Sequence, residues 1–261
     1  MYLPYVYCLG SFPESQINIL PEVTSSRLTN LILDKKLIGS WKELQKKAAK
    51  NNKKIWESEL YRLERVCVFD GNLDIVLSTI PFSVRKMTTS FLSEVLNLGE
   101  GYFSKGMFSS IFVKTTDNLY SFLKKSDRYE SRNNYSFVGG TYSKTEKIIR
   151  NSHDFFESAK KEMYEEINIT PENIIFFNLI SVFITSQTHV CCLFYCSLNL
   201  SSGELTKKYQ SNHDRESSEL IELPVEKIMG FLTQNLPGDL FKTKLFKKAL
   251  PKIDLSRPII P

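Results

Sequence analysis

The segment from Phe155 to Ile169 most constrains the fold, because its residue pattern predicts an amphipathic helix with one buried side. The apolar stripe of this helix consists of Phe155, Phe156, Ala159, Met163 and Ile167. At about 100° per residue, Glu166 lies about 20° and Glu162 about 340° from Phe155, and Glu165 lies further round. Glu162 and Glu166 therefore border the stripe, and we expect both at the edge of the packed face.

The three glutamates of this helix are close enough to repel one another. Glu162, Glu165 and Glu166 stand at i, i+3 and i+4, a spacing that costs a helix a few tenths of a kcal/mol per like-charged pair. Solvent or a divalent cation would offset that cost. Carboxylates held by a rigid helix suit an oxygen-liganded Mg²⁺, while an ordinary charged helix face is the alternative reading.

Helix-like and strand-like segments alternate in mixed order along the chain, which predicts an α/β or α+β sandwich with helices on both sides of a sheet. Strands are expected at 5–9, 62–69, 73–80, 111–116, 119–123 and 220–223, with a buried hairpin over 174–198. Helices are expected at 25–36, 40–50, 84–96, 203–209, 225–232 and 239–250, besides the acidic one.

Composition and charge narrow the class of protein. The apolar run from Ile174 to Leu200 is divided by the polar residues 186–189, so a hairpin is favoured over a membrane span. The N-terminus shows no secretory signal, and the five cysteines are expected as small buried hydrophobes, four of them (Cys67, Cys191, Cys192 and Cys196) in strand-like runs. We therefore expect a cytoplasmic protein without a membrane partner.

The net charge of +5 is modest for a chain of 261 residues. Lysines gather at 241–248, where their spacing predicts one solvated helix face. A patch for a polyanion is the other reading of this run, but nucleic acid is not the expected partner.

Residues 139–169 resemble the Nudix box, a glycine followed after five residues by Glu, then by Arg-Glu, an apolar residue, any residue, Glu-Glu, any residue and Gly. Gly140 is followed by Glu146 after five residues, and Lys161 to Ile169 supply the second half. Lys161 stands where the box has Arg, Asn168 where it has Gly, and the gap after Glu146 is seven residues longer. Asn and Gly both tolerate the left-handed conformation that ends a helix, whereas Lys lacks the planar fork of Arg.

The wider order of motifs over residues 7 to 225 is similar to the animal UDP-glucose diphosphatase type of Nudix protein. Segments 8–17, 122–126, 194–198 and 208–217 carry this similarity. The family also has an N-terminal extension and an irregular box with a long insert. The resemblance implies an N-terminal α/β extension over residues 1–100 and a Nudix hydrolase domain, with a mixed sheet between helices, over 101–261.

The resemblance also implies a metal site and an activity. Mg²⁺, with Mn²⁺ as a substitute, would be held by Gly139, Glu162, Glu165 and Glu166, with Glu216 as an additional ligand. The catalytic set would be Glu162, Glu165 and Glu166, with Glu165 taking a proton. The expected reaction is the cleavage of UDP-glucose, or a related nucleotide diphosphate sugar, to UMP and a sugar 1-phosphate.

Candidate substrate contacts come from the residues themselves. Lys124, Lys125 and Arg128 would bind phosphate or ribose, Tyr135 would stack on a base, and Phe82 and Arg85 are further candidates to cover the base. Two other readings stay open: a Nudix hydrolase of capped RNA or dinucleotides, and a catalytically silent Nudix fold that binds a nucleotide or a protein. The oligomeric state is open as well.

Overall fold

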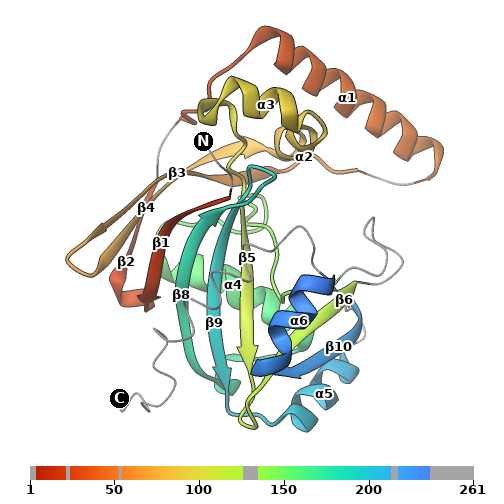
Figure 1. Cartoon of the computed structure of the whole chain (residues 1–261). Helices are drawn as coiled ribbons and strands as arrows, with labels where there is room; N and C mark the ends of the chain where they lie inside the picture. Colours follow the sequence, from red (N-terminus) through yellow and green to blue (C-terminus); the bar gives the residue numbers. More distant parts are fainter. Residues whose placement is uncertain (1–3, 22–23, 53–54, 126–134, 213–216, 236–261) are drawn as a thin grey trace.

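A seven-stranded sheet and a three-stranded sheet organise the protein (Figure 1). The structure is a computed structural model that describes residues 4–21, 24–52, 55–125, 135–212 and 217–235. The large sheet has the order β1-β8-β9-β5-β6-β10, with the short β7 paired to β6. Its strands are β1 (Tyr5–Phe12), β5 (Met107–Lys114), β6 (Leu119–Lys125), β7 (Tyr135–Ser136), β8 (Ile174–Ile184), β9 (Val190–Leu198) and β10 (Ser217–Pro224).

The large sheet is mixed, because β5 and β9 run parallel while the other pairs run antiparallel. Alternation along β9 sends successive side chains to opposite faces. Phe194 joins the core that contains α4 (Ser152–Ile167), whereas Leu193 joins the core that contains α6 (Val225–Asn235). The two helices therefore cover opposite faces of the sheet, which confirms the predicted mixed sheet between helices.

The small sheet has the order β2-β4-β3, with β2 parallel to β4. Its strands are β2 (Ile17–Pro21), β3 (Glu59–Phe69) and β4 (Asn72–Pro81). The helices α1 (Leu31–Lys50), α2 (Phe82–Ser90) and α3 (Leu92–Leu98) lie together beside it, at the top of Figure 1. The remaining elements are α5 (Ser202–Ser211) and the 3₁₀ turns η1 (Glu14–Gln16), η2 (Glu100–Tyr102) and η3 (Pro171–Asn173).

Strand β1 connects the N-terminal part of the chain to the large sheet. It pairs antiparallel with β8 at the edge of the large sheet, with Tyr5 opposite Ile184. Isolated bridges also join Leu60 to Ser143 and Arg62 to Gly106. The first 100 residues thus contribute both the small sheet and one strand of the large one. The division into units at 1–100 and 101–261 stays a prediction.

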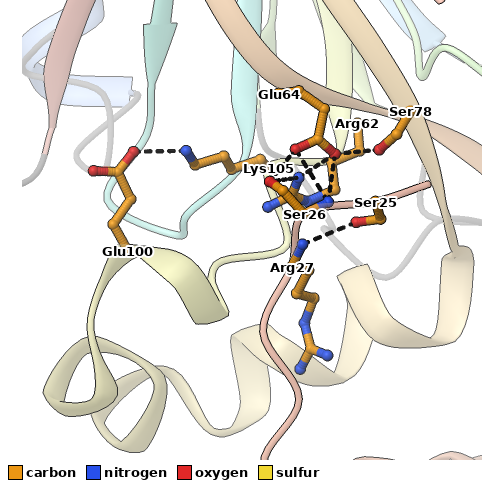
Figure 2. Close-up of polar contacts among 8 residues, drawn as sticks. All are labelled: Ser25, Ser26, Arg27, Arg62, Glu64, Ser78, Glu100 and Lys105. Atoms are coloured by element: carbon orange, nitrogen blue, oxygen red, sulfur yellow. Dashed lines mark hydrogen bonds and ion pairs between the residues drawn. The ribbon is translucent and has the colours of Figure 1, made fainter. Parts of the chain in front are cut away.

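A buried polar network fixes the segment before α1 onto the small sheet (Figure 2). Arg62 is 1 % exposed and pairs with Glu64 on the same strand. The Glu64 carboxylate also accepts hydrogen bonds from the hydroxyls of Ser26 and Ser78. Nearby, Lys105 pairs with Glu100 at 2.6 Å, and Glu100 accepts a 2.6 Å hydrogen bond from the Tyr5 hydroxyl.

Three of the sequence-based expectations for the N-terminal part are wrong. The helices predicted at 25–36 and 40–50 are one helix that begins at Leu31, because Asn30 caps it by accepting from Ile32 N and Leu33 N. The helix predicted over 84–96 is interrupted at Phe91, whose φ of −115° and ψ of 31° are not helical. Strand β2 was not predicted.

The cysteine prediction is wrong for Cys67 alone among the five. Cys8, Cys191, Cys192 and Cys196 are buried, but Cys67 is exposed because it lies near the tip of the β3–β4 hairpin. Phe69 at that tip is 72 % exposed, so the hairpin extends past the core there.

The predicted hairpin over 174–198 is confirmed as β8 and β9. Among the described residues, the helices are all too short or too polar to cross a bilayer. The helix and lysine run predicted at 239–250 lie outside the described residues.

Candidate active site

The acidic helix α4 forms as its residue pattern predicts. Asn151 caps its N-terminus by accepting a 2.9 Å hydrogen bond from Asp154 N, and Asn168 ends it in the left-handed conformation at φ 56°. The predicted apolar stripe is buried throughout, with Phe155, Phe156, Ala159, Met163 and Ile167 each at most 1 % exposed. The helix packs on the sheet through aromatic contacts, such as Phe156 with Phe194 at 5.3 Å between ring centroids.

The three glutamates lie around the edge of the packed face in the predicted order. Glu166 is buried at 6 % exposure, Glu162 is partly buried, and the Glu165 side chain is 48 % exposed. Attachment to a helix whose adjoining face is fully packed limits where each carboxylate can reach.

The glycine pair lies directly against this helix. Gly139 N donates a 2.8 Å hydrogen bond to Glu166 Oε2. A Cβ atom on Gly140 would overlap the carboxylate of Glu162, and one on Gly139, at φ 141°, would overlap the Ser109 carbonyl oxygen. Ser109 holds the pair in place, since its amide donates to Gly140 O at 2.8 Å and its hydroxyl accepts from Gly140 N at 3.2 Å. Position 139 thus requires glycine, whereas a side chain at position 140 would displace the Glu162 carboxylate.

Two lysines neutralise part of the acidic charge. Lys125 Nζ lies 3.4 Å from Glu166 Oε1. Lys161 Nζ lies 3.2 Å from carboxylate oxygens of both Glu146 and Glu165. Glu146 is therefore brought into the site despite the longer gap before α4, and Lys161, at the position of the Nudix-box arginine, connects it to the helix.

The surroundings of Glu162 disfavour the ionised form of its carboxyl group. Burial, followed by the charges of Glu166, Glu165 and Glu146, raises the pKa of Glu162 to about 7 from an ordinary value of 4.5, and Lys161 offsets only a part. Burial alone would lower the pKa of Lys161, but hydrogen bonds to Glu146 and Glu165 raise it. The site therefore holds more negative charge than its own lysines compensate.

These residues line a cavity of about 1090 Å³, which is large enough for a nucleotide-sized ligand. Its wall includes Arg85, Phe108, Ser109, Lys125, Tyr135, Phe137, Gly139, Gly140, Thr141, Glu146, Tyr164 and the three glutamates of α4. Acidic groups and the glycine pair form one part of the wall, and cationic and aromatic side chains form another.

The structure gathers some of the predicted site residues and not others. Gly139, Glu162, Glu165, Glu166, Lys125 and Tyr135 all line the cavity. Lys124 does not, because alternation along β6 turns it toward Glu219 at 3.5 Å. Phe82 packs on Trp41 with ring centroids 5.9 Å apart, away from the cavity wall. Arg128 and Glu216 lie outside the described residues.

In the described part of the chain, no three His, Cys, Asp or Glu side chains converge into a group that could hold a metal ion. Glu166 is engaged by Gly139 N and Lys125, and Glu165 is engaged by Lys161. The carboxylates line one cavity, but Glu165 and Glu166 bind protein groups and the set does not converge on a common point.

The sequence gives no indication of the role of Ser109, and Arg85, a candidate to cover the base, does line the cavity. Ser109 sits in β5, which pairs with β9, and no local pattern indicates that it supports the glycine pair. Arg85 reaches the cavity from α2 in the N-terminal part. For Glu146, the sequence signal is its spacing of five intervening residues after Gly140, as in the Nudix box.

No protein-family model and no curated protein sequence matches this chain. Solved structures do resemble part of it. The MutT protein from Methanosarcina mazei Go1 aligns at 16 % identity and a TM-score of 0.36, over 57 % of this chain and 95 % of its own. The Nudix hydrolase RenU from M. smegmatis aligns at 11 % identity and a TM-score of 0.39, over 59 % and 90 %.

A bifunctional NMN adenylyltransferase/ADP ribose pyrophosphatase from Francisella tularensis aligns at 9 % identity and a TM-score of 0.39, over 64 % of this chain and 47 % of its own. At these identities and TM-scores, the likeness does not by itself assign the chain to a family.

Proposed function

We propose that the protein is a divalent-cation-dependent pyrophosphohydrolase of nucleoside diphosphate derivatives, and that UDP-sugars are its substrates. One observation carries this proposal: Glu162 and Glu166 lie against Gly140 and Gly139, respectively, on the wall of a nucleotide-sized cavity. The resemblance of residues 139–169 to the Nudix box independently supports the same residues.

The chemistry of the donor atoms suits a hard cation, and the carboxylates would have to move together to hold it, since among the described residues they do not converge on one point. Carboxylate and carbonyl oxygens are the ligands that Mg²⁺ and Mn²⁺ accept. Burial is the main cause of the raised pKa of Glu162, and the charges of the neighbouring glutamates raise it further; a cation would offset this second contribution. Glu162 and Glu166 would hold the ion, with Glu165 and the carbonyl oxygen of Gly139 as further ligands. Lys125 and Lys161 would give up their contacts with these carboxylates when the ion binds.

The bound cation would supply charge neutralisation at the phosphates and a lower pKa for an attacking water. The protein's own groups would do the rest. Glu165, with a 48 % exposed side chain, would accept the proton of that water. The water oxygen would form a bond to one phosphorus while the bridging P–O bond breaks. UMP and a sugar 1-phosphate would leave.

Aromatic residues supply a place for a base. Tyr135 and Phe108 line the cavity, and Tyr135 is held with its ring centroid 4.9 Å from that of Phe231. A base stacked on such rings is bound largely through its π-face, which every base offers. The preference for uridine and a sugar therefore rests on the similarity over residues 7 to 225.

The test is a hydrolysis assay on the full chain with Mg²⁺ or Mn²⁺, using UDP-glucose, ADP-ribose, a dinucleoside polyphosphate and capped RNA. We expect turnover of UDP-glucose, its loss in Glu166→Gln, and unchanged turnover in Glu157→Gln. Glu157 is a matched control because it lies on α4 and pairs with Lys160 at 2.9 Å, away from the cavity wall. Turnover of capped RNA without any turnover of nucleotide sugars would contradict the substrate assignment.

One contact favours a second candidate, a silent domain that binds a nucleotide or a protein. Lys161 bonds both Glu146 and Glu165, and a lysine that stayed there would keep two carboxylates from a cation. A thermal shift separates the candidates: a hydrolase should gain melting temperature with Mn²⁺, and gain more when UDP-glucose is added. Stabilisation by UDP-glucose alone, without a cation effect and without turnover, would favour the silent domain.

A further inference from the structure

Arg85 brings a guanidinium from the N-terminal part of the chain into the wall of the candidate active site. It lies on α2, yet it lines the same cavity as the glutamates of α4. Its Nη1 donates a 3.2 Å hydrogen bond to Thr141 Oγ1. Thr141 directly follows Gly140, against which the Glu162 carboxylate packs, so Arg85 contacts the cavity wall one residue beyond the glycine pair.

The guanidinium is held in place on several sides. Its central carbon lies 5.9 Å from the ring centroid of Phe108, within cation–π range. The side-chain stem passes over Gly106, where an added Cβ would come within 2.8 Å of Arg85 Cδ. Thr89, on the same helix, lies 3.3 Å from His189 Nε2 in the β8–β9 turn, which anchors α2 to the large sheet.

Arg85 also carries charge that the site does not neutralise. Within the described residues, no carboxylate is paired with Arg85, and its Nε atom is buried without a hydrogen-bond partner. Among the described residues of the cavity wall, the second cation is Lys125, which already lies 3.4 Å from Glu166. An arginine has five N–H donors in a planar fork that matches phosphate oxygens, and here one of them is used.

We propose that Arg85 binds a phosphate of the substrate, so that helix α2 of the N-terminal part completes the active site. This inference rests on the proposed function. It gives a role to each charged part of the cavity wall. The glutamates face one end of the diphosphate, and Arg85 binds the phosphate group that points toward Thr141. The N-terminal helices are then a part of the substrate site as well as a structural addition.

Steady-state kinetics with UDP-glucose test the proposal through Arg85→Gln and Arg85→Lys. We expect KM to rise at least 10-fold in Arg85→Gln, and 3- to 10-fold in Arg85→Lys, which keeps the charge but lacks the fork. The kcat value should stay within about 3-fold of wild type, because the carboxylates remain in place. Arg65→Gln is the matched control, since Arg65 is exposed on β3.

A binding measurement separates failure of this inference from failure of the proposed function. Titration with UDP in the presence of Mg²⁺ requires no turnover, and Arg85→Gln should weaken it at least 10-fold. If wild type hydrolyses UDP-glucose while both Arg85 variants behave like Arg65→Gln, the inference is wrong and the hydrolase proposal stands. If wild type binds UDP through Arg85 without hydrolysing any substrate, the hydrolase proposal fails alone. Absence of UDP binding by wild type overturns the inference.

Should Arg85→Gln lose its folded state, Arg85→Lys carries the test by itself. Its stem can follow the same path over Gly106, so a wild-type melting temperature with unchanged KM would overturn the proposal. A higher KM at unchanged kcat and melting temperature would support it.

Discussion

The carboxylate of Glu162 lies where the side chain of residue 140 would be, so Gly140 and Glu162 share one space. Gly140 is fixed there because its carbonyl oxygen accepts from Ser109 N at 2.8 Å. Gly140 is therefore needed to leave room for the Glu162 carboxylate. Its backbone conformation does not require glycine, because only Gly139 of the pair has a positive φ.

Gly140→Ala should displace the Glu162 carboxylate and lower kcat at least 100-fold, since a shift of about 1 Å in a catalytic group can cost that much. Gly39→Ala is the control, because nothing lies within 4 Å of its added Cβ. It should leave activity unchanged and raise the free energy of unfolding by about 0.5–1 kcal/mol, as expected in the interior of helix α1. Wild-type kcat in Gly140→Ala would show that Glu162 is not needed.

The pKa of Glu162 predicts how stability depends on pH. Because its folded-state pKa of about 7 exceeds the ordinary value of 4.5, the folded protein binds more protons than the unfolded chain between those pH values. This group's contribution to stability is thus present at low pH and is lost as pH rises toward 7. Between pH 5 and pH 8, the free energy of unfolding should fall by about 2 kcal/mol because of this group, and Glu162→Gln should remove that fall. Urea unfolding at each pH measures it.

Glu157→Gln should change the pH dependence in the opposite sense. Burial tends to raise the pKa of Glu157, but the hydrogen bond and charge of Lys160 outweigh it and lower that pKa. Its stabilising contribution is therefore present at neutral pH and lost on acidification through the ordinary range. Identical pH profiles for the two variants would contradict the assignment of the buried charge to Glu162.

Lys161 competes with a cation for two carboxylates, so Lys161→Met should tighten Mn²⁺ binding several-fold. The change removes a positive charge that lies 3.2 Å from both Glu146 and Glu165. Lys160→Met is the matched control, because Lys160 pairs with Glu157 on the same helix and should not alter Mn²⁺ affinity. Calorimetric titration measures both dissociation constants. Weaker Mn²⁺ binding in Lys161→Met would mean that the lysine orients the carboxylates.

Local periodicity explains why helix α4 could be predicted from the sequence. A 3.6-residue repeat, an Asn at each end and glutamates beside the apolar stripe all follow from residues near one another in the chain. The support that Ser109 gives to the glycine pair and the contact of Arg85 with Thr141 could not be predicted in this way. Their positions depend on how β5 and α2 pack against distant segments, which no short pattern encodes.

Helix α1 shows how burial overrides a local signal. The sequence predicts separate helices at 25–36 and 40–50, yet Leu37 and Trp41, at their junction, are buried at 4 % and 7 % exposure. Their burial stabilises a continuous helix by more than the cost of one interior glycine, about 1 kcal/mol. Strand β2 was missed because only Ile17 and Ile19 of its five residues are buried.

The Arg62–Glu64 pair should be the most sensitive site for stability in the N-terminal part. Their side chains are 1 % and 4 % exposed, and Glu64 also accepts from Ser26 and Ser78 (Figure 2). Glu64→Gln leaves the buried Arg62 charge without its partner, and we expect a loss of about 3–5 kcal/mol in urea unfolding. The exposed Lys36–Glu94 pair is the control, and Glu94→Gln should cost less than about 1 kcal/mol. Combining Arg62→Met with Glu64→Gln should recover part of the loss, because no buried charge then remains. Equal losses in the single and double variants would show that lost packing, and not an unpaired charge, sets the cost.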